Sequence, residues 1–264
     1  MTAREQLWYL IRGVVNDSYE VTIFCDEFER IYNFETDNEQ LSEQERSMFR
    51  SLSKMAGRFS EFEEDLKIPN MYFNKEDICK AAKSILQIEN MSTAHKVTFA
   101  PGLTKEEVSD IEMRYNICFP KSLRDFLMLA LPVSAGFYNW RDDSAENINY
   151  IKTVIAWPKE AMKDQAEEVE WCDEWGNKPE NVAGVAEEVK RQLQKAPILI
   201  PVYGHRYMPM IEAENPPVLS VYGTDIIYYG ENLSNYFDIE FGEKKQKDIA
   251  FECILPVPFW SEIM

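Results

Sequence analysis

The chain has 264 residues and carries 46 Asp and Glu against 28 Lys and Arg, which gives a formal net charge of −18. A chain this acidic is repelled by nucleic acids and by anionic membranes, so neither is an expected partner. Apolar residues make up 45% of the chain, which excludes a disordered polypeptide and is enough to build a buried core.

Nothing in the sequence indicates export or membrane insertion. Charged residues interrupt the apolar positions of the first 20 residues, unlike the apolar region of a signal peptide. No stretch approaches the roughly 20 apolar residues of a membrane span. The cysteines are scattered, odd in number and never spaced as CxxC, which favours reduced and buried thiols in a cytoplasmic protein. They are Cys25, Cys79, Cys118, Cys172 and Cys253.

Residues 1–91 are predicted to form an antiparallel helical bundle. Apolar side chains recur at helical spacing in four stretches. The first runs from residue 2 to about 15 and the second covers about 21–32. Ser42 and Glu45 form a capping box for the third, whose apolar stripe is predicted to extend to Phe62, and Asn74 is the expected N-cap of the fourth. Short connections between amphipathic helices favour antiparallel packing.

Residues 95–264 are predicted to form an α+β domain. Thr104 and Glu107 form another capping box, and Pro120 begins a helix that we expect to continue to Leu131. A last short helix is predicted to start near Asn232. β-Branched and aromatic runs favour strands in a meandering antiparallel sheet. The expected strands are 150–157, 198–203, 218–222 and 224–229. A very acidic, helical insertion is expected at about 159–195.

The residues that carry out catalysis in known motifs are scarce. The chain has two histidines and lacks HExxH, G-x-S-x-G and phosphate-loop patterns. We therefore expect no enzymatic activity, no metal and no cofactor. One group of polar and aromatic residues near predicted turns is a candidate small-molecule pocket, although turn histidines and aspartates more often bond nearby backbone. Its members are Tyr203, His205, Arg206, Tyr207, Asp225 and Tyr228.

The second domain resembles the SUKH superfamily over about residues 95–245. The resemblance rests on residues 103–111 and 119–127, which pair an acid-rich helix with an aromatic-Pro step and a Leu-x-x-Phe-Leu pattern. Residues 197–207 and 217–230 match in order and spacing. The superfamily includes the domain named for yeast cell-wall synthesis regulators and many bacterial immunity proteins. The resemblance implies an antiparallel sheet flanked by helices.

Residues 1–91 resemble the colicin-D-type immunity proteins, which are small acidic helical bundles that block a tRNA-cleaving toxin. Residues 23–29 (IFCDEFE), the capping-box helix and residues 75–78 (KEDI) carry this resemblance. The motifs are short, so the same pattern is also expected of other acidic four-helix bundles.

Together the resemblances imply an immunity protein that binds the catalytic domain of a basic toxin. Its carboxylates would occupy the toxin's cationic active site and block it. Two alternatives stay open: a regulatory scaffold for a cellular protein, and a small-molecule-binding domain that uses the candidate pocket. Acids beside aromatic residues are the expected toxin contacts. They are Trp140, Asp142, Asp143, Glu170, Trp171, Asp173, Glu174 and Trp175, with Asp26, Glu29, Glu61, Glu63, Glu64 and Asp65 in the bundle.

Overall fold

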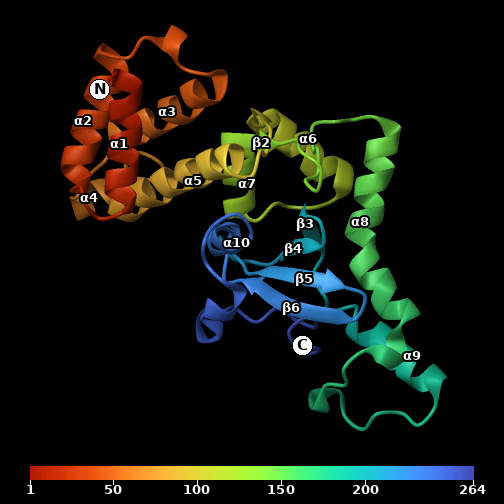
Figure 1. The fold of residues 1–264 in the computed structure, drawn as a ribbon. Coiled ribbons are helices and arrows are strands. Elements are labelled where there is room, and N and C mark those ends of the chain that lie inside the picture. The colour runs from red at the N-terminus through yellow and green to blue at the C-terminus, as the bar shows by residue number, and fades with distance from the viewer. The chain divides into compact units, whose positions relative to one another are not determined.

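The computed structural model describes all residues from 1 to 264 and confirms the predicted α+β class. The chain divides into two compact units. The first, the helical unit, comprises Met1–Gly102 and Met128–Leu131. The second, the sheet unit, comprises Leu103–Leu127 and Pro132–Met264. Figure 1 shows their elements.

Four long helices build the helical unit, as the sequence predicts. They are α1 (Ala3–Val15), α2 (Val21–Phe34), α3 (Glu43–Ala56) and α5 (Lys75–Thr93), with the short η1 (Asn38–Gln40) and α4 (Glu63–Leu66) between them. Strand β1 (Phe99–Pro101) pairs with β2 (Ala130–Pro132). Capping boxes at Thr2, Ser42 and Asn74 start α1, α3 and α5, because each side chain accepts a backbone N–H that the first turn leaves unpaired.

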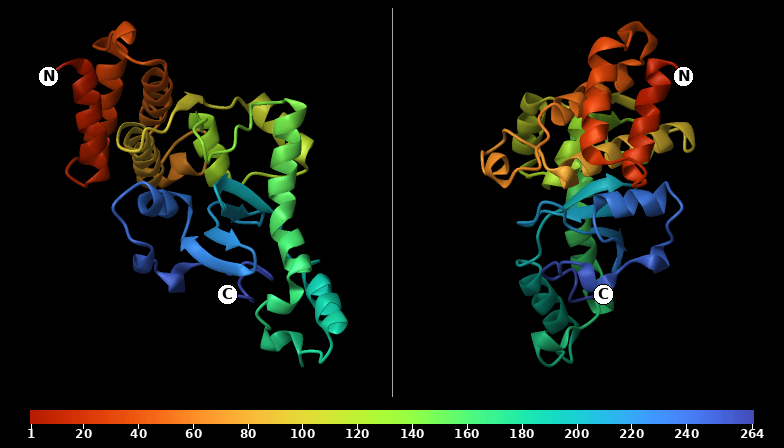
Figure 2. Two further views of the ribbon diagram at one scale, coloured as in Figure 1. Left: turned by 45° about the vertical axis from the view of Figure 1, so that its right-hand side comes forward. Right: turned by 90° about the vertical axis from the view of Figure 1, so that its left-hand side faces the viewer.

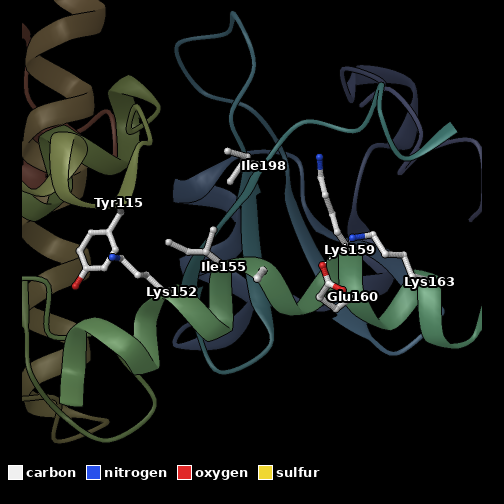
Figure 3. A pocket seen from close by; sticks show the side chains of 8 residues that line it. Tyr115, Lys152, Ile155, Lys159, Glu160, Lys163 and Ile198 are labelled. Atoms are coloured by element: carbon white, nitrogen blue, oxygen red, sulfur yellow. Dashed lines mark hydrogen bonds and ion pairs between the residues drawn. The ribbon is translucent and has the colours of Figure 1, made fainter. Parts of the chain in front are cut away.

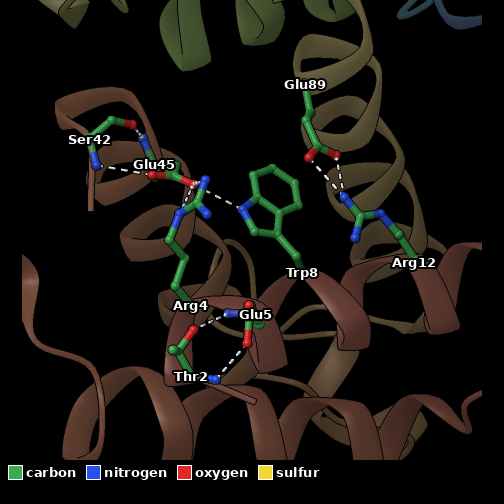
Figure 4. Close-up of polar contacts among 8 residues, drawn as sticks. All are labelled: Thr2, Arg4, Glu5, Trp8, Arg12, Ser42, Glu45 and Glu89. Carbon is green, nitrogen blue, oxygen red and sulfur yellow. Dashed lines mark hydrogen bonds and ion pairs between the residues drawn. The ribbon is translucent and has the colours of Figure 1, made fainter. Parts of the chain in front are cut away.

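An aromatic core holds these helices together. Trp8 meets Phe49 edge to face at 5.1 Å between ring centroids, and Phe28 meets Phe49 at 5.9 Å. The carboxylate of Glu45, which caps α3, is buried beside this core. It accepts hydrogen bonds from Arg4 Nε at 2.8 Å and from the Trp8 indole N–H at 2.9 Å (Figure 4). One acid therefore links the start of α3 to two residues of α1.

The sheet unit places helices around a four-stranded antiparallel meander. Its helices are α6 (Lys105–Tyr115), α7 (Lys121–Leu129), α8 (Ala145–Asp164), α9 (Val182–Gln192) and α10 (Leu233–Glu240), with short turns η2 (Ala166–Glu168), η3 (Asp173–Trp175), η4 (Gln246–Asp248) and η5 (Phe251–Cys253). Its strands are β3 (Leu199–Tyr203), β4 (Arg206–Pro209), β5 (Val218–Tyr222) and β6 (Asp225–Gly230), in the order β3-β4-β5-β6. Asn232 caps α10 as expected, accepting the Asn235 N–H.

The two faces of this sheet have different surroundings. Figure 2 shows α10 on one side and the long helix α8 running past the other. Because side chains alternate along a strand, neighbours in sequence belong to different faces. Tyr207 joins the apolar core that contains Met162, Val189 and Trp260, whereas the preceding Arg206 pairs with Glu240 of α10.

Three predicted boundaries are wrong. Residues 150–157 belong to α8 and form no strand, because Ser144 caps a helix and Ile151, Val154 and Pro158 recur at helical spacing. The helix after Pro120 ends at Leu129, and the next three residues pair as β2. The third bundle helix ends at Ala56 and so excludes Phe62. Strand β4 and the short pair β1-β2 were not predicted.

No helix is both long enough and apolar enough to cross a membrane. All five cysteines are free thiols, but the expectation that they are buried is confirmed for Cys25 alone: Cys79 and Cys172 are partly exposed, and Cys118 and Cys253 are exposed. Burial raises the pKa of the Cys25 thiol to about 12. That thiol is therefore protonated and unreactive at neutral pH.

Replacing Glu45 by Ala should destabilise the protein by about 3 kcal/mol, because the Trp8 indole N–H loses its buried acceptor and α3 loses half of its capping box. Chemical denaturation measures this change. The matched control, Glu43→Ala, removes an exposed acid from the same helical turn and should cost less than about 1 kcal/mol. Equal losses in the two variants would contradict a stabilising role for the buried Glu45 carboxylate.

The same carboxylate predicts a pH dependence. Burial opposes ionisation of Glu45, but hydrogen bonds from Arg4, Trp8 and the Ser42 N–H outweigh it and hold its pKa below the ordinary value of 4.5. Its ionised form therefore stabilises the fold above about pH 4.5, and this contribution is lost as the pH falls through the folded pKa. The unfolding free energy of Glu45→Gln should fall less between about pH 5 and about pH 3 than that of the wild type.

Candidate functional site

The connection between α3 and α5 is a compact loop, here called the 58–73 loop, whose two ends are tied together. Phe59 and Phe73 form an isolated parallel bridge. The Ser60 N–H donates to the Phe73 carbonyl at 3.0 Å, and the Phe73 N–H donates to the Arg58 carbonyl at 2.9 Å. Compact loops with adjoining ends are frequently functional.

Arg58 braces the loop from within. Its guanidinium lies 5.0 Å from the centroid of the Phe73 ring and donates to the backbone carbonyls of Asn70 and Met71. Ser60 donates its hydroxyl to Asp65 at 2.7 Å and accepts the Phe62 N–H at 3.1 Å. These contacts give the loop a defined conformation although α4 is only four residues long.

The outer surface of this loop combines acids with large apolar side chains. Phe62 is 74% exposed, and Leu66, Ile68, Met71 and Tyr72 are each between 37% and 49% exposed. The carboxylates of Glu61, Glu63 and Glu64 are exposed beside them, and Asp65 is half-buried. Lys67, the only lysine of the loop, pairs with Glu64 at 2.8 Å. The sequence pointed to these four acids but not to the exposed apolar residues of the same loop.

The predicted contacts on α2 differ in exposure. Asp26 is exposed, and Glu29 is half-buried. A Cβ atom added to Gly57 would lie 2.8 Å from Glu29 Oε1, which places this carboxylate at the beginning of the 58–73 loop. Glu29 therefore adds negative charge to the base of the loop.

A second acidic surface lies between α8 and α9 in the sheet unit. Glu170, Asp173 and Glu174 are exposed there, as a contact surface requires. Trp175, however, is only 9% exposed: it stacks on Phe259 and donates its indole N–H to Glu262 at 2.9 Å. Its assignment as a contact is wrong, because core side chains cover its ring.

Trp171 is partly exposed but already engaged. Its indole N–H donates to the Gly176 carbonyl at 2.7 Å, its ring meets Trp175 edge to face, and Lys178 lies 5.9 Å from its ring centroid. The acids of this surface thus lie near one partly exposed indole, that of Trp171. They do not accompany a group of exposed apolar side chains as the acids of the 58–73 loop do.

The remaining predicted contacts lie just before α8. Trp140 is 2% exposed and packs edge to face on Tyr115 and Phe119, so the structure contradicts its assignment as a contact. Asp142 and Asp143 are exposed. Asp142 accepts the Ser144 N–H at 2.9 Å, and this backbone hydrogen bond lowers its pKa. Asp142 therefore helps to shape the entry to α8.

The six residues proposed as a pocket are distributed over both faces and the turns of the sheet. Tyr203 and Arg206 lie on the α10 side, where Tyr203 contacts Phe241. Tyr207 and Tyr228 lie on the opposite side. The Tyr207 hydroxyl donates to the Val154 carbonyl, and the Tyr228 hydroxyl shares a hydrogen bond with the Ser261 hydroxyl. The other two are exposed: His205 lies in the turn between β3 and β4, and Asp225 begins β6. The structure therefore does not gather the six around one cavity.

Arg206 instead belongs to a buried polar cluster. Its guanidinium carbon lies 3.7 Å from the centroid of the Tyr229 ring, and one amino group donates to the Ser220 hydroxyl at 2.9 Å. Its Nε lies 3.5 Å from Glu240 Oε2. Burial raises the pKa of the neighbouring Tyr236 phenol well above 10. Partial desolvation and the Arg206 charge lower the pKa of His205.

A groove of about 270 Å³ runs along α8 (Figure 3). Ile155 and Ile198 contribute apolar surface, and three lysines lie along the helix. Two of these cations are already engaged: Lys159 donates to the Ala196 carbonyl, and Lys163 pairs with Glu160 at 2.7 Å. Burial and the Lys163 charge lower the pKa of Lys159. The groove consequently offers an anion little free positive charge.

Clusters of at least three His, Cys, Asp or Glu side chains suited to a metal ion are absent. Comparisons with protein-family models, with curated proteins and with solved structures find no match to this chain. Among the chain's own surfaces, the 58–73 loop combines exposed acids with exposed apolar side chains.

Replacing Arg206 by Ala should lower the unfolding free energy by about 3 kcal/mol, because the Glu240 carboxylate, 21% exposed, loses its cation. Arg30→Ala is the matched control, since its pairs with Glu27 and Glu35 are exposed on both sides and should contribute less than about 1 kcal/mol. Thermal or chemical denaturation measures both. An Arg206→Ala protein as stable as the wild type would favour a ligand-binding role for this residue.

Proposed function

We propose that the chain is an immunity protein that binds the catalytic domain of a bacterial toxin, a nuclease, and blocks its active site. The observation that carries the proposal is the 58–73 loop, where exposed carboxylates and exposed apolar side chains occur within one short segment. A surface of this kind is typical of a protein-binding site, in which apolar contacts provide affinity and the charged rim provides orientation.

The choice of partner follows from charge. A nuclease binds phosphates and therefore carries a cationic active site, for which an inhibitor's carboxylates compete. A net charge of −18 would also accelerate association with such a domain by electrostatic steering. The surplus of acid thus fits an inhibitor better than a protein that binds nucleic acid itself.

The sequence resemblances support the same proposal. Residues 95–245 resemble SUKH domains, many of which are bacterial immunity proteins, and residues 1–91 resemble colicin-D-type immunity proteins. The alternative is a regulatory scaffold for a cellular protein, which the yeast members of the SUKH group suggest. The two functions differ in whether the partner is a toxin.

Co-expression of the full chain with the toxin domain encoded beside its gene should restore growth and yield a stable complex. The association rate should fall about tenfold or more between low salt and about 0.5 M salt, because screening removes the steering. Surface plasmon resonance measures this rate. Continued killing, with no complex even at low salt, would rule out the proposal. A complex formed instead with a housekeeping protein would favour the scaffold.

A further inference from the structure

We infer that the 58–73 loop is the anchor of the toxin complex, and that its partner surface is an apolar cleft bordered by Lys and Arg. This inference rests on the proposed function and names the segment that makes the contact. Phe62 and Met71 enter the cleft, while Glu61 and Glu63 meet the cations at its border.

Exposure of apolar surface is the first argument. Phe62, Leu66, Ile68, Met71 and Tyr72 lie within one loop and are all exposed, with Phe62 at 74%. Monomeric proteins rarely leave contiguous apolar surface uncovered unless it binds something. The cost of leaving these side chains in water is recovered when a partner covers them.

The second argument is preorganisation. The bridge between Phe59 and Phe73 closes the loop, and Arg58 bonds to the Asn70 and Met71 carbonyls. Ser60 holds Asp65 beside the start of α4. A loop already ordered in the free protein loses little conformational entropy on binding, so more of its contact energy appears as affinity.

Charge then selects the occupant. The loop displays Glu61, Glu63 and Glu64, while its cations are used internally: Lys67 pairs with Glu64, and Arg58 donates to backbone carbonyls. A second copy of this chain, at −18, and an anionic membrane would both be repelled. A cationic protein surface with an apolar centre is complementary to both features of the loop.

The decisive variant is Phe62→Ala with Met71→Ala in the full chain. Phe62 is 74% exposed and Met71 is 49% exposed, so the unfolding midpoint should change little. The dissociation constant for the toxin domain should rise about 30-fold or more, mainly through faster dissociation. The matched control is Phe34→Ala, which removes an exposed aromatic ring, 83% accessible, from α2 of the same unit. It should change binding less than about twofold.

A second pair of variants tests the charged border. Glu61→Gln with Glu63→Gln should slow association several-fold and weaken its salt dependence, with little effect on dissociation. Asp173→Gln with Glu174→Gln, on the acidic surface between α8 and α9, provides the control and should leave the salt dependence closer to that of the wild type.

The possible results separate the two proposals. If the wild type protects cells and Phe62→Ala with Met71→Ala binds the toxin domain unchanged, the loop is not the anchor and only this inference fails. If the wild type neither binds nor protects, the proposed function fails together with it. A concentration-dependent dimer that the double variant abolishes would assign the loop to a second copy and overturn the inference.

Discussion

The excess of carboxylates over cationic side chains, 18 in all, is the constraint on which the arrangement of this protein depends. An ionised carboxylate can be buried only where cations or hydrogen-bond donors compensate its lost hydration. Glu45 meets this condition through Arg4, Trp8 and Ser42, and Glu240 meets it through Arg206. The surplus acids have no such partners, so folding leaves them in water.

The few cations intensify this effect because several are committed to internal contacts. Arg58 bonds to loop carbonyls, Lys159 bonds to the Ala196 carbonyl, and Arg206 lies among Ser220, Tyr229 and Glu240. These cations are held by the protein's own groups and are not free to pair with a partner's acids, although their charges still count toward the net −18. In the helical unit this acidity coincides with uncovered apolar side chains on the 58–73 loop, and the proposed binding site is inferred from that coincidence.

Local signals predicted much of the fold. Capping boxes at Ser42 and Thr104 mark helix starts correctly, because the cap and its partner lie within one turn. The prediction failed for residues 150–157, where β-branched and aromatic composition was given more weight than helical spacing. Strand β4 was missed since Arg206–Pro209 is short and contains an arginine, and only pairing with β3 and β5 makes it a strand.

The sequence by itself determined the charge, the helical caps and the acids that could face a partner, because these depend on composition and on neighbours within a turn. Only the tertiary structure decided which aromatic residues are available. Trp140 and Trp175 lie beside acids in the sequence and resemble binding residues, yet both are buried in the core. Phe62 looks like a continuation of the α3 stripe, yet it is 74% exposed. Burial depends on contacts between distant segments, and no local pattern specifies which large side chains those contacts will cover.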